Sequence, residues 1–210
     1  MNTTPASYPS IHVELPFDEG VAITPSRKLT DEEFEIFCQK NPDLQVELEP
    51  DGTLFIIPPV HLDSGHFELE IAGELRNYAK KSSKGRTFGS STGFKLPDGS
   101  TRAADAAWVS DEQIAIARLS SEERKSFARL VPEFIVEIRS DTDRLARLQK
   151  KMTDTWIANG VRLAWLIDPV EQKAYIYRAD GSIQVVADFS AKLGGEDVLP
   201  GFEFDLGLLK

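Results

Sequence analysis

The first quarter of the chain has a hydrophobic pattern that predicts an arm, a helix and a hairpin. Residues 1–28 are rich in Pro, Ser and Thr without a sustained period, and we expect a loosely structured N-terminal arm there. Thr30 and Glu33 have the spacing of a capping box, which predicts a short helix directly after it. Two runs with strand character, residues 44–48 and 53–57, flank a turn sequence and predict a hairpin.

The middle of the chain predicts one amphipathic helix followed by short strands. Phe67, Ile71, Leu75 and Tyr78 recur at spacings of four, four and three, which places them on one face of a helix over residues 64–79. Short strands are expected after a basic loop, at residues 87–89, 93–96 and 102–109. A helix-rich insertion is expected over residues 110–131, with helical turns at 110–113 and 120–129.

The last third predicts a strand–helix–strand unit and a closing hairpin. Residues 134–139 are apolar except for Glu137 and the final Arg139, as in a strand that is covered on both faces. A helix is expected from Asp143 to Asn159, where the following glycine terminates it. The remaining strands are expected at residues 161–167, 174–177 and 183–186.

This order of elements predicts a fold of the α/β (α+β) class. The strand–helix–strand unit favours a right-handed crossover, and therefore a mixed central sheet flanked by helices. The early helix and hairpin would form an N-terminal extension of that sheet. The length of 210 residues suits one core. We therefore expect an arm over residues 1–28 and a single domain over residues 29–210.

Composition narrows the class of protein. Hydrophobic residues make up 41% of the chain and charged residues 28%, which is ordinary for a globular protein. No apolar run reaches the ~20 residues needed to cross a bilayer, and the N-terminus lacks the layout of a signal peptide. Cys38 is the only cysteine, so it cannot form an internal disulfide. A cytoplasmic location is expected.

The net charge of −10 opposes long-range attraction to nucleic acid. Basic residues are nevertheless concentrated in two places, and any contact with DNA would have to rely on them. One cluster comprises Lys80, Lys81, Lys84 and Arg86, and the other comprises Arg144, Arg147, Lys150 and Lys151.

Glu137 interrupts an otherwise apolar strand, where a carboxylate is costly unless it is paired or coordinated. If the strand that contains Asp105 lies beside it, the two carboxylates can converge and hold a hard cation such as Mg²⁺ or Mn²⁺. Such a cation lowers the pKa of a bound water, and a nearby lysine stabilises charge on a phosphate. These residues indicate metal-dependent phosphodiester hydrolysis.

The lysine for such a site is expected on the helix that follows the Glu137 strand. At about 100° per residue, Met152 and Trp156 share the buried face of that helix, and Lys151 lies on its shoulder. The same rotation per residue directs Lys150 toward solvent. Lys151 is therefore the candidate that can reach the end of the strand.

Several motifs together resemble one family. They are STGFKLPDG at residues 91–99, Asp105, FIVEIRS at 134–140, LQKKM at 148–152, NGVRLAWLIDP at 159–169 and LPGF at 199–202. Similarity runs from about residue 29 to the last residue. This combination is similar to the Uma2 family (DUF820), a large set of cyanobacterial and other bacterial proteins in the PD-(D/E)XK restriction-endonuclease-like superfamily.

The resemblance implies a Mg²⁺-dependent endonuclease that acts on DNA, often as a homodimer. It implies that Asp105 and Glu137 are metal ligands, that Glu68 on the first core helix completes the set, and that Lys151 is the catalytic lysine, displaced onto the helix. Arg139 occupies the usual lysine position two residues after the glutamate. Arginine binds phosphate but cannot act as a general base, so Arg139 is a candidate for phosphate contact.

Other interpretations of the same residues stay open. Glu137 could form a structural ion pair with Arg139 or Lys151, and Asp105 could simply accept backbone N–H groups at a strand end. Lys151 and Glu68 could be solvated surface residues, and the tryptophans are expected in the core. The protein would then be a catalytically weak or inactive binding module. A hydrolase of another phosphate ester is a third alternative.

Overall fold

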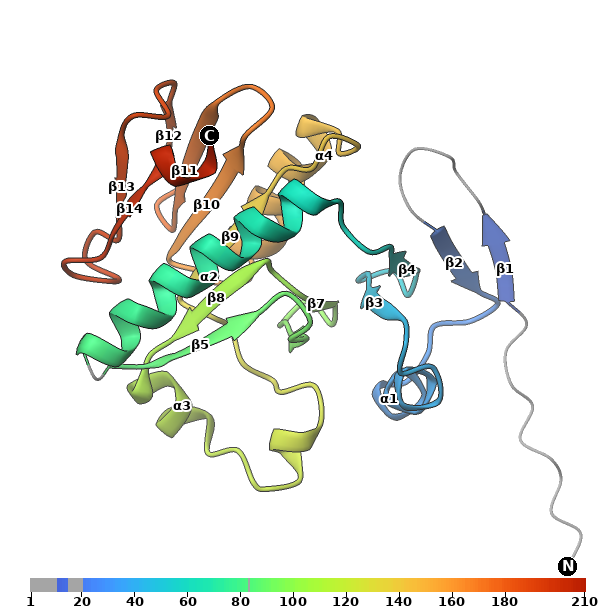
Figure 1. The fold of residues 1–210 in the computed structure, drawn as a ribbon. Coiled ribbons are helices and arrows are strands. Elements are labelled where there is room, and N and C mark those ends of the chain that lie inside the picture. Colours follow the sequence, from blue (N-terminus) through green and yellow to red (C-terminus); the bar gives the residue numbers. More distant parts are fainter. Residues whose placement is uncertain (1–10, 15–20, 83) are drawn as a thin grey trace, which may run out of the picture. The chain divides into compact units, whose positions relative to one another are not determined.

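The computed structural model describes residues 11–14, 21–82 and 84–210 (Figure 1). The chain divides into two compact units, Met1–Pro58 and Pro59–Lys210, which are described separately below. A single domain over residues 29–210 stays a prediction. Within the described ranges, no helix combines the length and the hydropathy needed to cross a membrane.

The first unit contains one helix and an antiparallel sheet in the order β1-β2-β4-β3. Its elements are β1 (Ile11–Glu14), β2 (Val21–Pro25), α1 (Asp31–Lys40), β3 (Gln45–Leu48) and β4 (Leu54–Ile57). The capping box is confirmed, because the Glu33 N–H donates to the Thr30 hydroxyl and the Thr30 N–H donates to the Glu33 carboxylate. The predicted hairpin is confirmed as β3 and β4.

The structure differs from the expected loose arm at β1 and β2, because β2 pairs with β4 and buries Ile23. Residues 1–10 and 15–20 lie outside the described part.

The second unit is built on a mixed sheet in the order β12-β11-β10-β9-β8-β5, which confirms the expected fold class. Only the β9–β10 pair is parallel, as the strand–helix–strand pattern predicts. The strands are β5 (Arg86–Gly89), β8 (Ala106–Val109), β9 (Phe134–Ile138), β10 (Leu163–Asp168), β11 (Lys173–Arg178) and β12 (Ile183–Val186). A separate short hairpin comprises β6 (Phe94–Lys95) and β7 (Thr101–Arg102).

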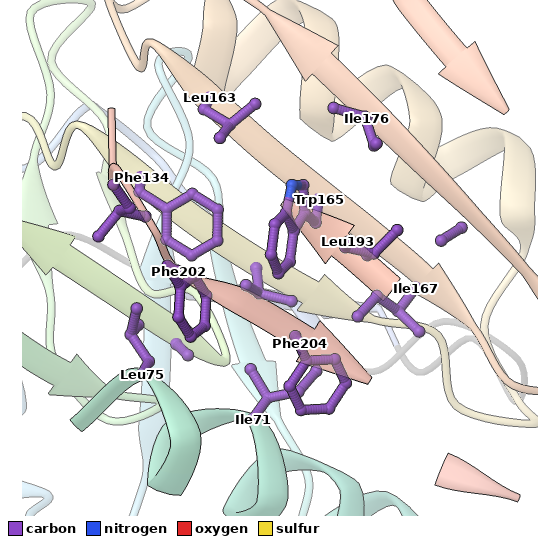
Figure 2. Close-up of a cluster of buried hydrophobic side chains, with 14 of the residues drawn as sticks. Ile71, Leu75, Phe134, Leu163, Trp165, Ile167, Ile176, Leu193, Phe202 and Phe204 are labelled. Atoms are coloured by element: carbon purple, nitrogen blue, oxygen red, sulfur yellow. The ribbon is translucent and has the colours of Figure 1, made fainter. Parts of the chain in front are cut away.

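One face of this sheet is covered by α2 (Leu62–Ser82) together with the C-terminal segment (Figure 2). That segment contains β13 (Lys192–Gly194), β14 (Glu203–Asp205) and the 3-10 helix η3 (Leu206–Leu209). The Phe202 ring stacks on Trp165 with ring centroids 5.7 Å apart, and Phe134 packs edge-on against the same tryptophan at 4.8 Å. Phe202, which is remote in sequence, therefore packs against β9 and β10 on the face that α2 covers.

The opposite face is covered by α4 (Leu145–Lys150) and η2 (Lys151–Ile157). Met152 and Trp156 are fully buried there, as their helical spacing predicts. The expected α-helix over residues 143–159 is wrong in one respect, because η2 is a π-helix.

The insertion between β8 and β9 is only partly helical. The helix α3 (Asp111–Ala117) begins at Ser110, whose hydroxyl accepts the Gln113 N–H, so the first predicted turn is confirmed. The second predicted turn is present only as a single 3-10 turn, η1 (Glu123–Lys125), whose Glu123 N–H donates to the Ser120 hydroxyl, so the rest of residues 120–129 is less helical than expected. All residues from 120 to 126 are exposed, so this stretch has no apolar face with which to pack a helix.

Candidate active site

The register of the sheet brings Asp105 beside Glu137. In the antiparallel β8–β9 pair, Ala106 lies opposite Val136, so one further step places Asp105 opposite Glu137. The Ile138 N–H donates to Asp105 Oδ2 at 2.6 Å. Successive N–H groups of a strand point to opposite sides, and the Arg139 N–H donates to the Ile167 carbonyl of β10. The Ile138 N–H therefore points toward β8, and the Asp105 carboxylate accepts it in place of a β8 carbonyl group. This bond explains why the predicted strand over residues 102–109 breaks before Ala106.

Glu137 is almost completely buried and accepts two donors on one oxygen. Its Oε1 atom lies 2.7 Å from Trp156 Nε1 and 2.9 Å from Lys151 Nζ. The ammonium group also donates to the Ala103 carbonyl at 3.3 Å. The Lys151 side chain is 19% exposed, so it points into the structure rather than into bulk solvent. Lys151 therefore reaches the end of the strand from the shoulder of its helix.

Asp105 is in an environment that opposes its ionisation. Its carboxyl group is surrounded by protein, although the residue as a whole keeps some accessible surface. This burial raises the pKa of Asp105 well above its ordinary value, and the Glu137 and Glu68 carboxylates raise it further. The Ile138 N–H and Lys151 oppose these effects without cancelling them. Two other carboxylates and the Lys151 ammonium group thus act on Asp105.

Glu68 lies on α2 close enough to act on Asp105, and it is partly buried. Burial raises the pKa of Glu68, and a hydrogen bond with Ser90 offsets part of that increase. In the part of the chain that the structure describes, however, no group of three or more His, Cys, Asp or Glu side chains is arranged to hold a metal ion. Glu68 therefore contributes charge to the site without joining a ready set of three ligands.

Asp105 and Glu137 nevertheless fit a divalent cation. Both are oxygen donors, and they repel each other strongly enough to raise the pKa of Asp105. A Mg²⁺ or Mn²⁺ ion needs only one or two protein carboxylates, because water and substrate phosphate supply its other ligands. Bound between these two groups, it would replace their repulsion with attraction.

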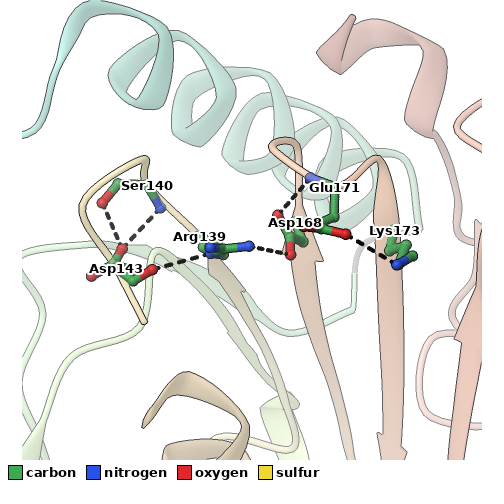
Figure 3. A network of polar contacts seen from close by, with 6 residues as sticks. All are labelled: Arg139, Ser140, Asp143, Asp168, Glu171 and Lys173. Carbon is green, nitrogen blue, oxygen red and sulfur yellow. Dashed lines mark hydrogen bonds and ion pairs between the residues drawn. The ribbon is translucent and has the colours of Figure 1, made fainter. Parts of the chain in front are cut away.

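Arg139 is committed to a different set of contacts (Figure 3). Its Nη1 atom lies 2.8 Å from Asp168 Oδ2, and its Nε–H donates to the Asp143 carbonyl at 3.1 Å. The Asp168 side chain is fully buried and also accepts the Glu171 N–H. Asp143 in turn binds the N–H and hydroxyl of Ser140. The structure thus brings Asp105, Glu137, Glu68 and Lys151 together and directs Arg139 elsewhere.

Two features of the site could not be found by sequence reasoning. Trp156 has the spacing of a core residue, and nothing in that spacing indicates that its indole N–H binds Glu137. Asp168 precedes a proline and looks like a strand stop, yet it is the buried partner of Arg139. In both cases the signal lies in side-chain geometry rather than in the hydrophobic period.

Comparisons with known proteins agree with this architecture. The model of the Uma2 family, described as "Putative restriction endonuclease", matches residues 31–207. A search of curated proteins found no match. Among solved structures, the chain is similar to a protein of Anabaena variabilis ATCC 29413 described as a putative nuclease belonging to DUF820. The TM-score is 0.69 at 18% identity, over 86% of this chain and 97% of that one. At this identity the likeness shows a common fold.

Proposed function

The chain belongs to the Uma2 family of restriction-endonuclease-like proteins, and from that premise we propose that it hydrolyses DNA phosphodiester bonds with the aid of Mg²⁺ or Mn²⁺. The observation that carries this proposal is the pairing of Asp105 with Glu137 beside Lys151. Two buried carboxylates held next to one amine are costly for stability, and they are the parts that metal-assisted hydrolysis requires.

Each residue has a distinct role in this proposal. Asp105 and Glu137 would hold the cation, which supplies an activated water and screens the negative charge of the phosphate. Lys151 is fixed by Glu137 and by the Ala103 carbonyl, so its positive charge has a defined place beside the carboxylates. From there it can stabilise the charge that develops on the phosphate. Glu68 contributes negative charge that favours a cation in the site.

Binding of DNA by this acidic chain requires a local concentration of positive charge. Arg144, Arg147 and Lys150 are exposed on and next to α4, the helix that runs directly into Lys151. They would offset the net charge of −10 where a phosphate backbone approaches the carboxylates. A homodimer and a cytoplasmic location stay predictions from the sequence.

The proposal is tested with plasmid and single-stranded DNA in the presence of Mg²⁺, Mn²⁺ or EDTA. We expect metal-dependent nicking by the wild type, and its loss in Glu137→Gln and in Lys151→Ala. A matched control replaces an exposed Glu–Lys pair away from the site, with Glu203→Gln and Lys192→Ala, which should keep full activity. Nicking that survives Glu137→Gln would overturn the assignment.

A second candidate function is a binding module without catalysis, and one observation favours it. Glu137 already has Lys151 and Trp156 as partners, so the cluster can be stable without a metal. Calorimetry separates the two functions, because the binding module predicts no heat when millimolar Mn²⁺ is added. The nuclease predicts saturable binding that Asp105→Asn removes.

A further inference from the structure

We infer that Trp156 is a positioning residue of the metal site, because it holds the Glu137 carboxylate in place through a hydrogen bond that the π-helix makes possible. This role rests on the proposed function of Glu137 as a metal ligand. It gives the rare helix type of η2 a purpose, since π-helical turns occur frequently at functional sites.

The π-helix brings Lys151 and Trp156 to the same place. Residues five apart on an α-helix point about 140° away from each other, because each residue turns the helix by about 100°. A π-helix instead bonds each residue to the one five positions later, so residues at that spacing lie much closer to the same face. The Ala158 N–H binds the Thr153 carbonyl in this manner, at 3.0 Å. Lys151 and Trp156 consequently contact the same oxygen of Glu137, at 2.9 and 2.7 Å.

Trp156 is better suited than Lys151 to fix the direction of the carboxylate. Its side chain is fully buried, has only two rotatable bonds and packs beside the buried Met152, so the position of its N–H is set by the core. A lysine has a flexible stem, and its ammonium group is also the group expected to act on the phosphate. Partners of this kind, which orient a metal ligand from behind, typically change metal affinity by about 10–100-fold when they are lost.

Burial alone does not explain the Trp156 hydrogen bond. Trp165, on the opposite face of the same sheet, is also fully buried, yet its Nε1 atom has no hydrogen-bond partner within the described structure. This fold therefore tolerates a buried indole N–H without an acceptor. Trp165 also provides a matched control, because phenylalanine there keeps an aromatic ring against Phe134 and Phe202 and removes no hydrogen bond.

The first test compares Mn²⁺ affinity in Trp156→Phe and Trp165→Phe by titration calorimetry. We expect Trp156→Phe to bind Mn²⁺ about 10–100-fold more weakly than the wild type, and Trp165→Phe to bind it as the wild type does. Replacement of Trp156 by benzothienylalanine, in which sulfur replaces the N–H group, should reproduce the loss while preserving the ring and the packing. Equal affinity in all these variants would overturn the role of Trp156 and leave the proposed function intact.

The second test measures the response of the wild type to Mg²⁺, with Glu137→Gln as its control. The chain has three tryptophans, and each indole N–H group gives one signal in a ¹H–¹⁵N NMR spectrum. Mg²⁺ should shift the Trp156 signal in a saturable manner, leave the Trp165 signal in place, and have no effect in Glu137→Gln. A Trp156 signal that stays fixed while calorimetry detects binding would refute the positioning role. Absence of any binding would refute the proposed function and this role with it.

Discussion

Two buried carboxylates lie on neighbouring strands of the same sheet, and their surroundings differ. Glu137 is paired in register with Leu166, and Asp168 lies two residues further along that strand, so both side chains are on the same face. Glu137 forms an ion pair with Lys151 at 2.9 Å, and Asp168 forms one with Arg139 at 2.8 Å. Asp168 shares its arginine with no other carboxylate of the cluster in Figure 3, whereas the lysine of Glu137 also acts on Asp105.

The difference shows that charge balance, rather than burial, separates a structural ion pair from a candidate site. The Asp168 carboxylate and the Arg139 guanidinium neutralise each other, and Asp168 also accepts the Glu171 N–H. In the other cluster, burial raises the pKa of Asp105 most, and the carboxylates of Glu137 and Glu68 raise it further against the opposing charge of Lys151. A folded chain that keeps an excess of carboxylates inside loses stability, and a bound cation would restore it.

The largest expected effect is the loss of the balanced pair. Arg139→Ala leaves Asp168 buried without its counter-ion, so we expect the free energy of unfolding to fall by about 3–5 kcal/mol, measured with urea. The double replacement Arg139→Met with Asp168→Leu should recover most of this loss, because apolar side chains can replace a buried ion pair. A loss below about 1 kcal/mol in the single variant would remove the contrast between the two clusters.

The next effect is stabilisation of the unbalanced cluster by metal. Since only the folded chain brings Asp105 and Glu137 together, Mg²⁺ at about 100 times its dissociation constant should add about 2.7 kcal/mol to the free energy of unfolding. Thermal unfolding with and without EDTA measures this change. Glu137→Gln should show no such response, while the exposed Glu203→Gln should respond as the wild type does.

A smaller effect concerns pH in the absence of metal. The folded state raises the pKa of Asp105 above its ordinary value of 3.8, so the stability contributed by its protonated form is present below that value and is lost as the pH rises through the raised pKa. Asparagine cannot ionise. In EDTA, Asp105→Asn should therefore match the wild type near pH 4 and exceed its unfolding free energy by about 1 kcal/mol at pH 8. If the difference in unfolding free energy between Asp105→Asn and the wild type were larger at pH 4 than at pH 8, the prediction would be contradicted.

The smallest effect is expected at Lys150, the neighbour of Lys151. Lys150 is exposed at the end of α4, so Lys150→Ala should change the free energy of unfolding by less than about 0.5 kcal/mol and leave Mn²⁺ affinity unchanged. Urea unfolding and calorimetry check both values beside Lys151→Ala. Equal behaviour of the two lysine variants would mean that the position of Lys151 at Glu137 has no consequence.

Much of the fold follows from local sequence signals. The capping box of Thr30 and Glu33, the amphipathic spacing that begins at Phe67 and the largely apolar run of β9 each specify an element that the structure contains. Such signals work because capping and burial of one face depend on neighbours in the sequence. The stretch over residues 120–129 forms less helix than expected, since residues without an apolar face to pack extend no further than one 3-10 turn.

The site could be predicted only in outline. Glu137 could be identified because it is a carboxylate within a buried strand. Asp105 could be identified because it belongs to the preceding strand candidate, which is expected to lie beside that strand. The π-helix could not be predicted, because the hydrophobic spacing of Met152 and Trp156 is that of an ordinary α-helix. The partner of Arg139 was missed for a similar reason. Arg139 and Asp168 follow or end neighbouring strands, and their proximity can be inferred only from the parallel register of β9 and β10.

The aromatic stack behind β9 connects the C-terminal segment to the strand that carries Glu137. Phe202 lies against Trp165 and Phe134, and so forms the back wall of the strand that presents Glu137 (Figure 2). A polypeptide interrupted near residue 190, by a premature stop or by a protease, would still carry Asp105, Glu137 and Lys151. It would lack Phe202 behind the strand that carries Glu137, so we expect it neither to fold stably nor to bind a divalent cation.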